Sequence, residues 1–120
     1  MMTVEQCYTQ LGGDYADITR RMGTDERVIK FLGMLLRDNS FEQLKTALEK
    51  EDYGTAFRAA HTLKGVLLNL SVTSQAKVIS ELTEVLRPQQ ANDQIGPLFE
   101  KAKAAYAELT MGIEALLGKN

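Results

Sequence analysis

The sequence has 120 residues, of which 44% are hydrophobic and 25% are charged, as expected for one globular domain with a single core. The formal net charge of −2, with Lys and Arg scattered along the chain, argues against binding to nucleic acid. No stretch approaches the roughly 18 apolar residues of a membrane span, and the N-terminus lacks a signal-peptide pattern, so we expect a cytoplasmic protein without membrane contact. With one cysteine, Cys7, and one histidine, His61, we expect neither an intramolecular disulfide nor a metal site.

The first half of the chain shows a helical period. We expect a short helix from Thr3 to Leu11 that caps one end of the molecule. From Asp25, apolar residues recur at helical spacing at Val28, Ile29, Leu32, Leu35 and Leu36. Asp38-Asn39-Ser40 interrupts this pattern, and Ser40 with Gln43 has the spacing of a capping box. A kinked or restarted helix is therefore expected, with an apolar face of Phe41, Leu44, Ala47 and Leu48.

Three further helices are expected in the second half. The first begins at the N-cap Asp52 and runs to about Leu70, and the next spans Thr73 to Arg87 and stops against Pro88. A polar connection, Gln89 to Gly96, leads to the last helix, which has Pro97 in its first turn and an apolar stripe that reaches Leu116. No segment alternates with a period of two. The sequence thus predicts an all-α fold, an antiparallel up-and-down four-helix bundle with a short extra N-terminal helix, formed by one domain over residues 1–120.

The helix from Asp52 to Leu70 is the one with distinctive chemistry. At 100° per residue, its core face comprises Ala56, Ala59, Leu63, Val66, Leu67 and Leu70. The opposite face is centred on His61 and comprises Gly54, Phe57, Arg58, Lys64, Gly65 and Leu68. The period therefore predicts that His61 points to solvent rather than into the core.

The neighbours of His61 suit a carrier of phosphoryl groups. Neutral imidazole is nucleophilic near pH 7. Lys64, at i+3, can pair with an added negative charge, and Gly65, at i+4, leaves room for a partner at a cost of about 1 kcal/mol in helix propensity. Phe57 and Leu68, if exposed, form a small apolar docking patch beside the histidine.

Each of these residues also has a plainer interpretation. Lys64 is then an ordinary solvated residue, Gly65 permits close helix packing, and Phe57 and Leu68 are scattered surface residues. Enzymatic alternatives have less support, because there is no Walker-type or Gly-x-Gly-x-x-Gly loop for ATP and no second nucleophile or base on the face of His61. We therefore expect neither a kinase nor a hydrolase.

The run Ala59-Ala60-His61-Thr62-Leu63-Lys64-Gly65, followed by Asn69-Leu70, resembles the signature of histidine-containing phosphotransfer (HPt) domains, His-x-x-Lys-Gly and then Asn-Leu-Gly. The resemblance implies that His61 is the phosphoryl acceptor, Lys64 its electrostatic partner and Gly65 the residue that keeps access open. The chain departs from the pattern at Val66, Leu67 and Leu68, where small or polar residues are usual, and at Ser71, where glycine is usual.

The function implied by the resemblance is transfer of a phosphoryl group, on His61, between the aspartates of response-regulator receiver domains in a two-component phosphorelay fed by a hybrid histidine kinase. Such a chain needs no cofactor, because the receiver supplies Mg²⁺. We expect a monomer that docks through Phe57, Arg58, Leu68 and Asn69. The alternative is a non-catalytic helical interaction module that holds a receiver or another partner through the Phe57/Leu68 face.

Overall fold

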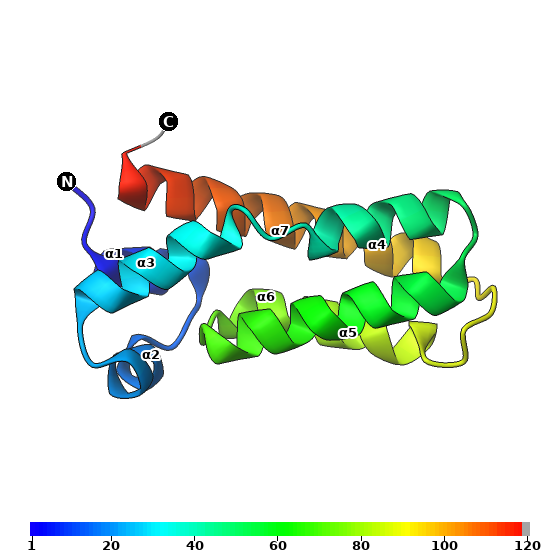
Figure 1. Ribbon diagram of the computed structural model, residues 1–120, viewed down its shortest axis with the longest axis horizontal. Helices are drawn as coiled ribbons and strands as arrows, with labels where there is room; N and C mark the ends of the chain where they lie inside the picture. Colours follow the sequence, from blue (N-terminus) through cyan, green and yellow to red (C-terminus); the bar gives the residue numbers. More distant parts are fainter. Residues whose placement is uncertain (119–120) are drawn as a thin grey trace.

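The computed structural model describes residues 1–118, and over these residues the chain is helical without strands (Figure 1). The seven helices within this range are α1 (Val4–Leu11), α2 (Tyr15–Met22), α3 (Asp25–Leu35), α4 (Ser40–Glu49), α5 (Tyr53–Asn69), α6 (Thr73–Leu86) and α7 (Ile95–Leu117). The molecule is elongated, with extents of 43 × 28 × 19 Å.

The four helices from α4 onwards form the long body of the molecule. Helix α5 packs against α4 and α6, and α6 packs against α7. Helix α4 meets α7 through aromatic stacking, because the ring of Phe41 lies 5.8 Å from that of Phe99 and 4.6 Å from that of Tyr106. Helices α1, α2 and α3 gather at one end, where the N-terminus and the C-terminal end of α7 also lie (Figure 1).

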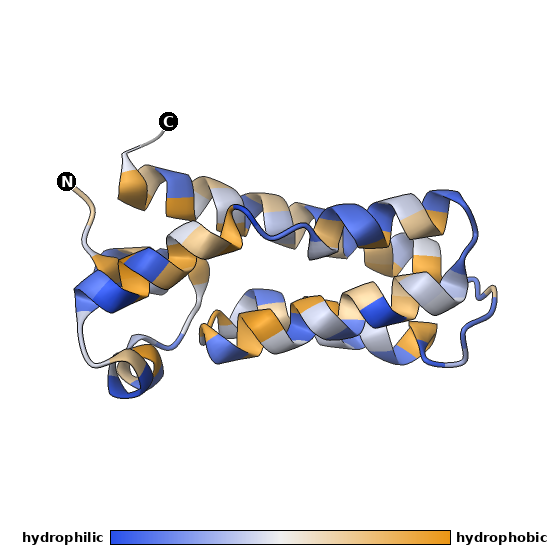
Figure 2. Ribbon diagram, in the orientation of Figure 1, coloured by the Kyte–Doolittle hydropathy of each residue, from blue (hydrophilic) through white to orange (hydrophobic). Residues whose placement is uncertain are grey.

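The core is built from the apolar stripes of these helices. Each long helix carries hydrophobic and hydrophilic residues on different sides (Figure 2). Fully buried leucines come from four different helices, at Leu32, Leu63, Leu82 and Leu109. Burial of each such side chain contributes about 1.5–3 kcal/mol, so the pairing of these stripes holds α5 in a fixed orientation.

Several expectations from the sequence are confirmed. The fold is all-α, and a short helix, α1, precedes the others. Asp52 is the N-cap of α5, where its carboxylate accepts a hydrogen bond from the Thr55 N–H at 3.1 Å. Pro97 lies in the first turn of α7, where its missing N–H has no helical partner to lose.

The break after α3 differs in detail from the prediction. The chain forms two separate helices, and the predicted capping box of Ser40 and Gln43 is wrong, because the N-cap of α4 is Asn39 and no side chain caps it there. The Asp38 carboxylate instead accepts a hydrogen bond from the Ser40 N–H at 2.8 Å. Ser40 itself is buried in the first turn of α4.

Helix α2 was not predicted. It has eight residues, and only Ile18 is buried, so its apolar stripe is too short to give a clear period. Its ends are well defined, since Asp14 accepts a hydrogen bond from the Asp17 N–H at 2.9 Å and Gly23 provides the C-cap with a φ of 87°.

Residues 1–118 contain neither a membrane-spanning helix nor a cluster of metal ligands. None of the helices in residues 1–118 has the length and apolar character needed to cross a membrane. Within the same range, the His, Cys, Asp and Glu side chains form no group of three or more that is placed to hold a metal ion.

Candidate functional site

His61 lies in the middle of α5 with its side chain exposed to solvent. On the same helix, Ala60 and Leu63, which are three positions apart, are fully buried against the core. Because residues three to four positions apart share a helix face, burial of this stripe turns His61 outward. The predicted exposure of the imidazole is therefore confirmed.

Phe57 supports the imidazole from one turn earlier in α5. The two rings stack with their centroids 6.0 Å apart and their planes at 28°. The Arg87 guanidinium lies 5.2 Å from the centroid of the Phe57 ring and covers it. Phe57 also packs against the core and is half-buried, so the expectation that it forms an exposed patch together with Leu68 is wrong.

Lys64 and Gly65 flank the histidine on its C-terminal side. Lys64 is half-buried and, at i+3, is a neighbour of His61 on the helix surface. A Cβ atom added to Gly65 would meet no other atom within 4 Å. The interpretation that Gly65 permits close helix packing is therefore wrong, and the space beside the imidazole is open.

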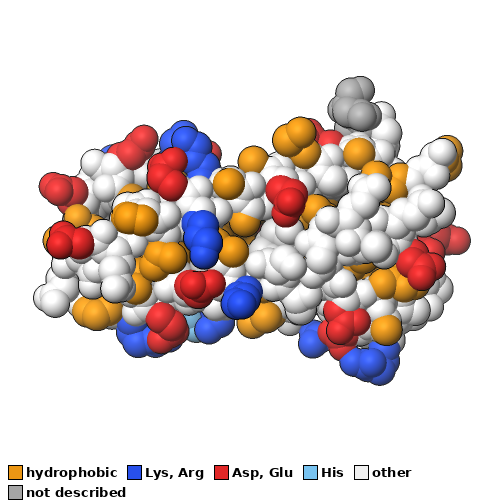
Figure 3. Space-filling view, turned by 180° about the vertical axis from the view of Figure 1, so that it is seen from behind, with side chains coloured by type: hydrophobic (Ala, Val, Ile, Leu, Met, Phe, Trp, Pro, Cys, Tyr) orange, Lys and Arg blue, Asp and Glu red, His pale blue; other side chains and the backbone are white. Residues whose placement is uncertain are grey.

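Helix α6 and its C-cap residue add two charged side chains to this surface, Glu84 and Arg87, that the sequence analysis missed. The Arg87 guanidinium donates hydrogen bonds to both carboxylate oxygens of Glu84, at 2.8 and 3.2 Å. These hydrogen bonds lower the pKa of Glu84, and the positive charges of Arg87, Lys64 and protonated His61 lower it further. Figure 3 shows the histidine among side chains of both charges.

The other residues expected at the docking surface are exposed. Arg58 is exposed, and its guanidinium donates a hydrogen bond to the Thr55 hydroxyl at 3.1 Å. Leu68 has 45% of its surface exposed, and Asn69 is also exposed. All three lie on the solvent side of α5, within about 12 Å of His61 along the helix axis at a rise of ~1.5 Å per residue.

An all-helical protein that presents one imidazole to solvent, beside a lysine and an open glycine, is suited to carrying a small anionic group. The comparison with family models identifies the family, since the model of the Hpt domain matches residues 32–118. The chain belongs to the Hpt domain family. Comparisons with curated proteins and with solved structures gave no significant match.

Membership of this family has functional consequences at a general level. Hpt domains take part in phosphorelays as phosphotransfer carriers rather than kinases, and they interact with receiver domains and histidine kinases. The matched segment includes α5 and α6, which carry the surface around His61.

Proposed function

We propose that this chain carries a phosphoryl group on His61 between the aspartates of receiver domains. The observation that supports the proposal most directly is the exposed imidazole in the middle of α5, next to the open space at Gly65. A receiver has to bring its aspartate to the ring nitrogen, and a helix without a side chain at i+4 leaves room for that approach.

The transfer itself needs only the imidazole of this chain. The lone pair of an unprotonated ring nitrogen forms a bond to phosphorus, the bond from phosphorus to the aspartyl oxygen breaks, and the carboxylate leaves with the bonding electrons. Reversal of these steps on a second receiver returns the nitrogen to its starting state. Mg²⁺ held by the receiver would screen the phosphoryl oxygens during both transfers.

The charged neighbours would set the stability of phosphohistidine. Lys64 would attract the phosphoryl oxygens, whereas the carboxylate of Glu84 would repel them. Arg87 pairs with Glu84 before transfer, and a phosphoryl group on His61 would compete with Glu84 for the guanidinium. The balance of these charges would keep phosphohistidine stable enough to carry the group and labile enough to release it.

The architecture fits a monomeric carrier. We propose that residues 1–120 form one domain in which α4, α5, α6 and α7 make an antiparallel up-and-down four-helix bundle, with α1, α2 and α3 at one end. The receiver would dock over the solvent side of α5, where Arg58, Leu68 and Asn69 are exposed, while Phe57 would support the imidazole.

Intact-mass spectrometry tests the proposal. The purified chain is mixed with phosphorylated receiver domains and Mg²⁺, and one added phosphoryl group is expected on the wild type and none on His61→Ala. The added group should be acid-labile, as phosphohistidine is. A chain that gains no phosphoryl group from any receiver, or a His61→Gln variant that preserves the biological output, would instead support a helical binding module in which His61 has no chemical role.

A further inference from the structure

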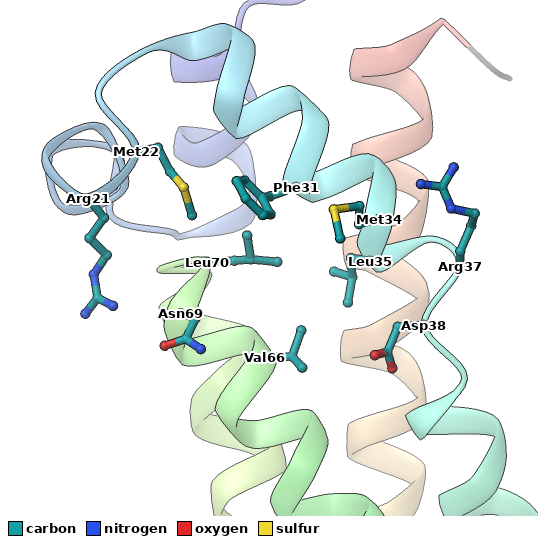
Figure 4. A pocket seen from close by; sticks show the side chains of 10 residues that line it. All are labelled: Arg21, Met22, Phe31, Met34, Leu35, Arg37, Asp38, Val66, Asn69 and Leu70. Atoms are coloured by element: carbon teal, nitrogen blue, oxygen red, sulfur yellow. The ribbon is translucent and has the colours of Figure 1, made fainter.

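The imidazole of His61 is enclosed on one side and open on the other. Toward the N-terminus of α5, the ring of Phe57 stacks on it, with the two centroids 6.0 Å apart. Toward the C-terminus, a Cβ added to Gly65 would meet no atom within 4 Å, and α5 continues past a groove that Val66 and Asn69 line together with residues of α2 and α3 (Figure 4). The contact with Phe57 therefore determines which side of the imidazole stays free for an approaching group.

Phe57 is itself held from two directions. It is partly buried and packs against the core. The Arg87 guanidinium carbon lies 5.2 Å from the centre of the Phe57 ring, over its face. Because a cation is attracted to the negative face of an aromatic ring, this contact restricts the motion of the ring. Arg87, Phe57 and His61 thus form a continuous series of contacts from the end of α6 to the imidazole.

The carboxylate of Glu84 orients the Arg87 side chain. Arg87 Nε donates a hydrogen bond to one carboxylate oxygen at 3.2 Å, and Arg87 Nη2 donates one to the other at 2.8 Å. Two such hydrogen bonds fix the plane of a guanidinium as well as its position. The two side chains are 53% and 58% exposed, so solvent screens their charges and the pair contributes little to stability. Its main consequence is the fixed place of the guanidinium over Phe57.

The backbone that carries Arg87 is also held close to α5. Leu86, the preceding residue, is fully buried. Gln89, two residues later, lies against Gly54 in the first turn of α5, where an added Cβ would come within 3.1 Å of Gln89 Oε1. Gly54 and Phe57 are three positions apart and share one face of α5. The absence of a side chain at Gly54 thus leaves room for the chain after α6 to approach α5 where Phe57 lies.

We propose that Phe57 and Arg87 are positioning residues for phosphoryl transfer. Arg87 fixes the ring of Phe57, and this ring keeps the imidazole in the rotamer whose free side faces Gly65. The inference rests on the proposed carrier function, and it assigns the orientation of the nucleophile to this chain rather than to the receiver. An exposed histidine in a helix has two common χ1 rotamers, and stacking on an aromatic ring favours one of them. Attack on phosphorus needs the nitrogen lone pair aligned with the bond that breaks, so an imidazole that is already oriented reacts faster.

Substitution of Phe57 tests the stack. Phe57→Leu keeps an apolar side chain against the core and removes the aromatic ring, whereas Phe57→Tyr keeps the ring. In single-turnover transfer from a phosphorylated receiver with Mg²⁺, Phe57→Leu should lower the rate at saturating receiver about two- to tenfold, the factor that corresponds to one aromatic pair. The receiver concentration at half-saturation should stay unchanged, because the stack acts on the imidazole rather than on docking. Phe57→Tyr should restore most of the rate.

A double substitution tests whether Arg87 acts through Phe57. Arg87→Gln removes the cation and should lower the saturating rate about two- to fivefold. The variant with both Phe57→Leu and Arg87→Gln should be no slower than Phe57→Leu alone, because residues in one series of contacts do not act additively. Arg20→Gln is a matched control. Arg20 also forms an i, i+3 ion pair, with Asp17, but it lies on α2, and its variant should transfer at the wild-type rate.

Two further measurements need no receiver. Three-bond NMR couplings across the Cα–Cβ bond of His61 should report one dominant χ1 rotamer in the wild type and in Phe57→Tyr, and averaged rotamers in Phe57→Leu. Phosphoramidate, a small donor that can approach the ring from any direction, should label all of these variants at the wild-type rate. Equal labelling would show that the reactivity of the imidazole itself is unchanged. Circular dichroism would verify that the variants are folded.

Each outcome has a defined meaning. A lower saturating rate with averaged rotamers in Phe57→Leu, and recovery of both in Phe57→Tyr, supports the positioning role. An unchanged saturating rate in Phe57→Leu overturns it and leaves the carrier function intact, and a change confined to half-saturation overturns it in favour of a docking role for Phe57. Losses that add in the double variant overturn the action of Arg87 through Phe57 in favour of direct contact between Arg87 and the phosphoryl group. A wild type that accepts no phosphoryl group from any receiver would refute the carrier function and, with it, the positioning role, even if the couplings show one rotamer.

Discussion

Replacement of Gly65 should stabilise the protein while it impairs transfer. Gly65 lies in the interior of α5, and a Cβ added there would meet no atom within 4 Å. Because glycine is about 1 kcal/mol less favourable than alanine inside a helix, Gly65→Ala should raise the free energy of unfolding by about that amount. For a chain of this size, the midpoint of thermal unfolding should rise by roughly 3–5 °C.

Transfer should respond in the opposite direction. The side chain of Gly65→Gln would fill the open space next to the imidazole, so single-turnover transfer from a phosphorylated receiver should be slower than in the wild type and slower than in Gly65→Ala. Gly33→Ala is a suitable control, because Gly33 lies inside α3 and its added Cβ would contact only Leu117, at 3.9 Å. That variant should be stabilised without a change in transfer. Equal transfer by Gly65→Gln and the wild type would refute the role of the open space.

Three further predictions concern charge. Lys64→Ala should shorten the lifetime of phosphohistidine about two- to fivefold, and an unaltered lifetime would remove that role from Lys64. Glu84→Gln should lengthen the same lifetime by a similar factor, because it removes a negative charge and releases Arg87; a shorter lifetime would contradict the repulsion. The pKa of Asp17 is lowered from 3.8, chiefly by the hydrogen bond from the Ser71 hydroxyl and then by the charges of Arg21 and Arg20. Ionised Asp17 therefore stabilises the fold above pH 3.8, and this contribution disappears as the pH falls through the folded-state pKa. The free energy of unfolding in urea, measured from about pH 5 down to about pH 2.5, should therefore fall less in Ser71→Gly than in the wild type. Equal losses in the two proteins would contradict the stabilising role of the hydrogen bond from Ser71 to Asp17.

The orientation of His61 could be predicted from the sequence because it depends on one helix. The apolar spacing of Ala56, Leu63 and Leu67 fixes which side of α5 is buried, and that side determines where the imidazole points. The N-cap at Asp52 is equally local, since it requires only a carboxylate before the first turn. Expectations of this kind need no knowledge of how helices pair.

Contacts between helices could not be predicted in the same way. Glu84 and Arg87 are more than 20 positions from His61 in the sequence, and only the packing of α6 on α5 brings them to its surface. For the same reason, the position of Arg87 over the ring of Phe57 could not be predicted from the sequence. The identity of residues near an active side chain thus depends on helix pairing even where the side chain itself is locally determined.

The sequence of α2 contains capping signals, but they are too weak to predict a helix by themselves. Asp14 and Gly23 stand at the positions of an N-cap and a C-cap, and Arg20 and Arg21 lie in the last turn, where cations are favoured. With Ile18 as its one buried residue, the helix lacks the apolar stripe that normally reveals a helix. The hydrogen bond between Asp17 and Ser71, which joins α2 to the turn after α5, connects residues 54 positions apart.

The most direct test of the central claim is to follow one phosphoryl group through a complete relay. A labelled phosphoreceiver, the chain and a second receiver are mixed with Mg²⁺, and the label on all three proteins is measured over time. The account predicts that the label leaves the first receiver, appears transiently on the chain and then accumulates on the second receiver, with no transit through His61→Gln. Accumulation on the second receiver at the same rate with His61→Gln would contradict the account.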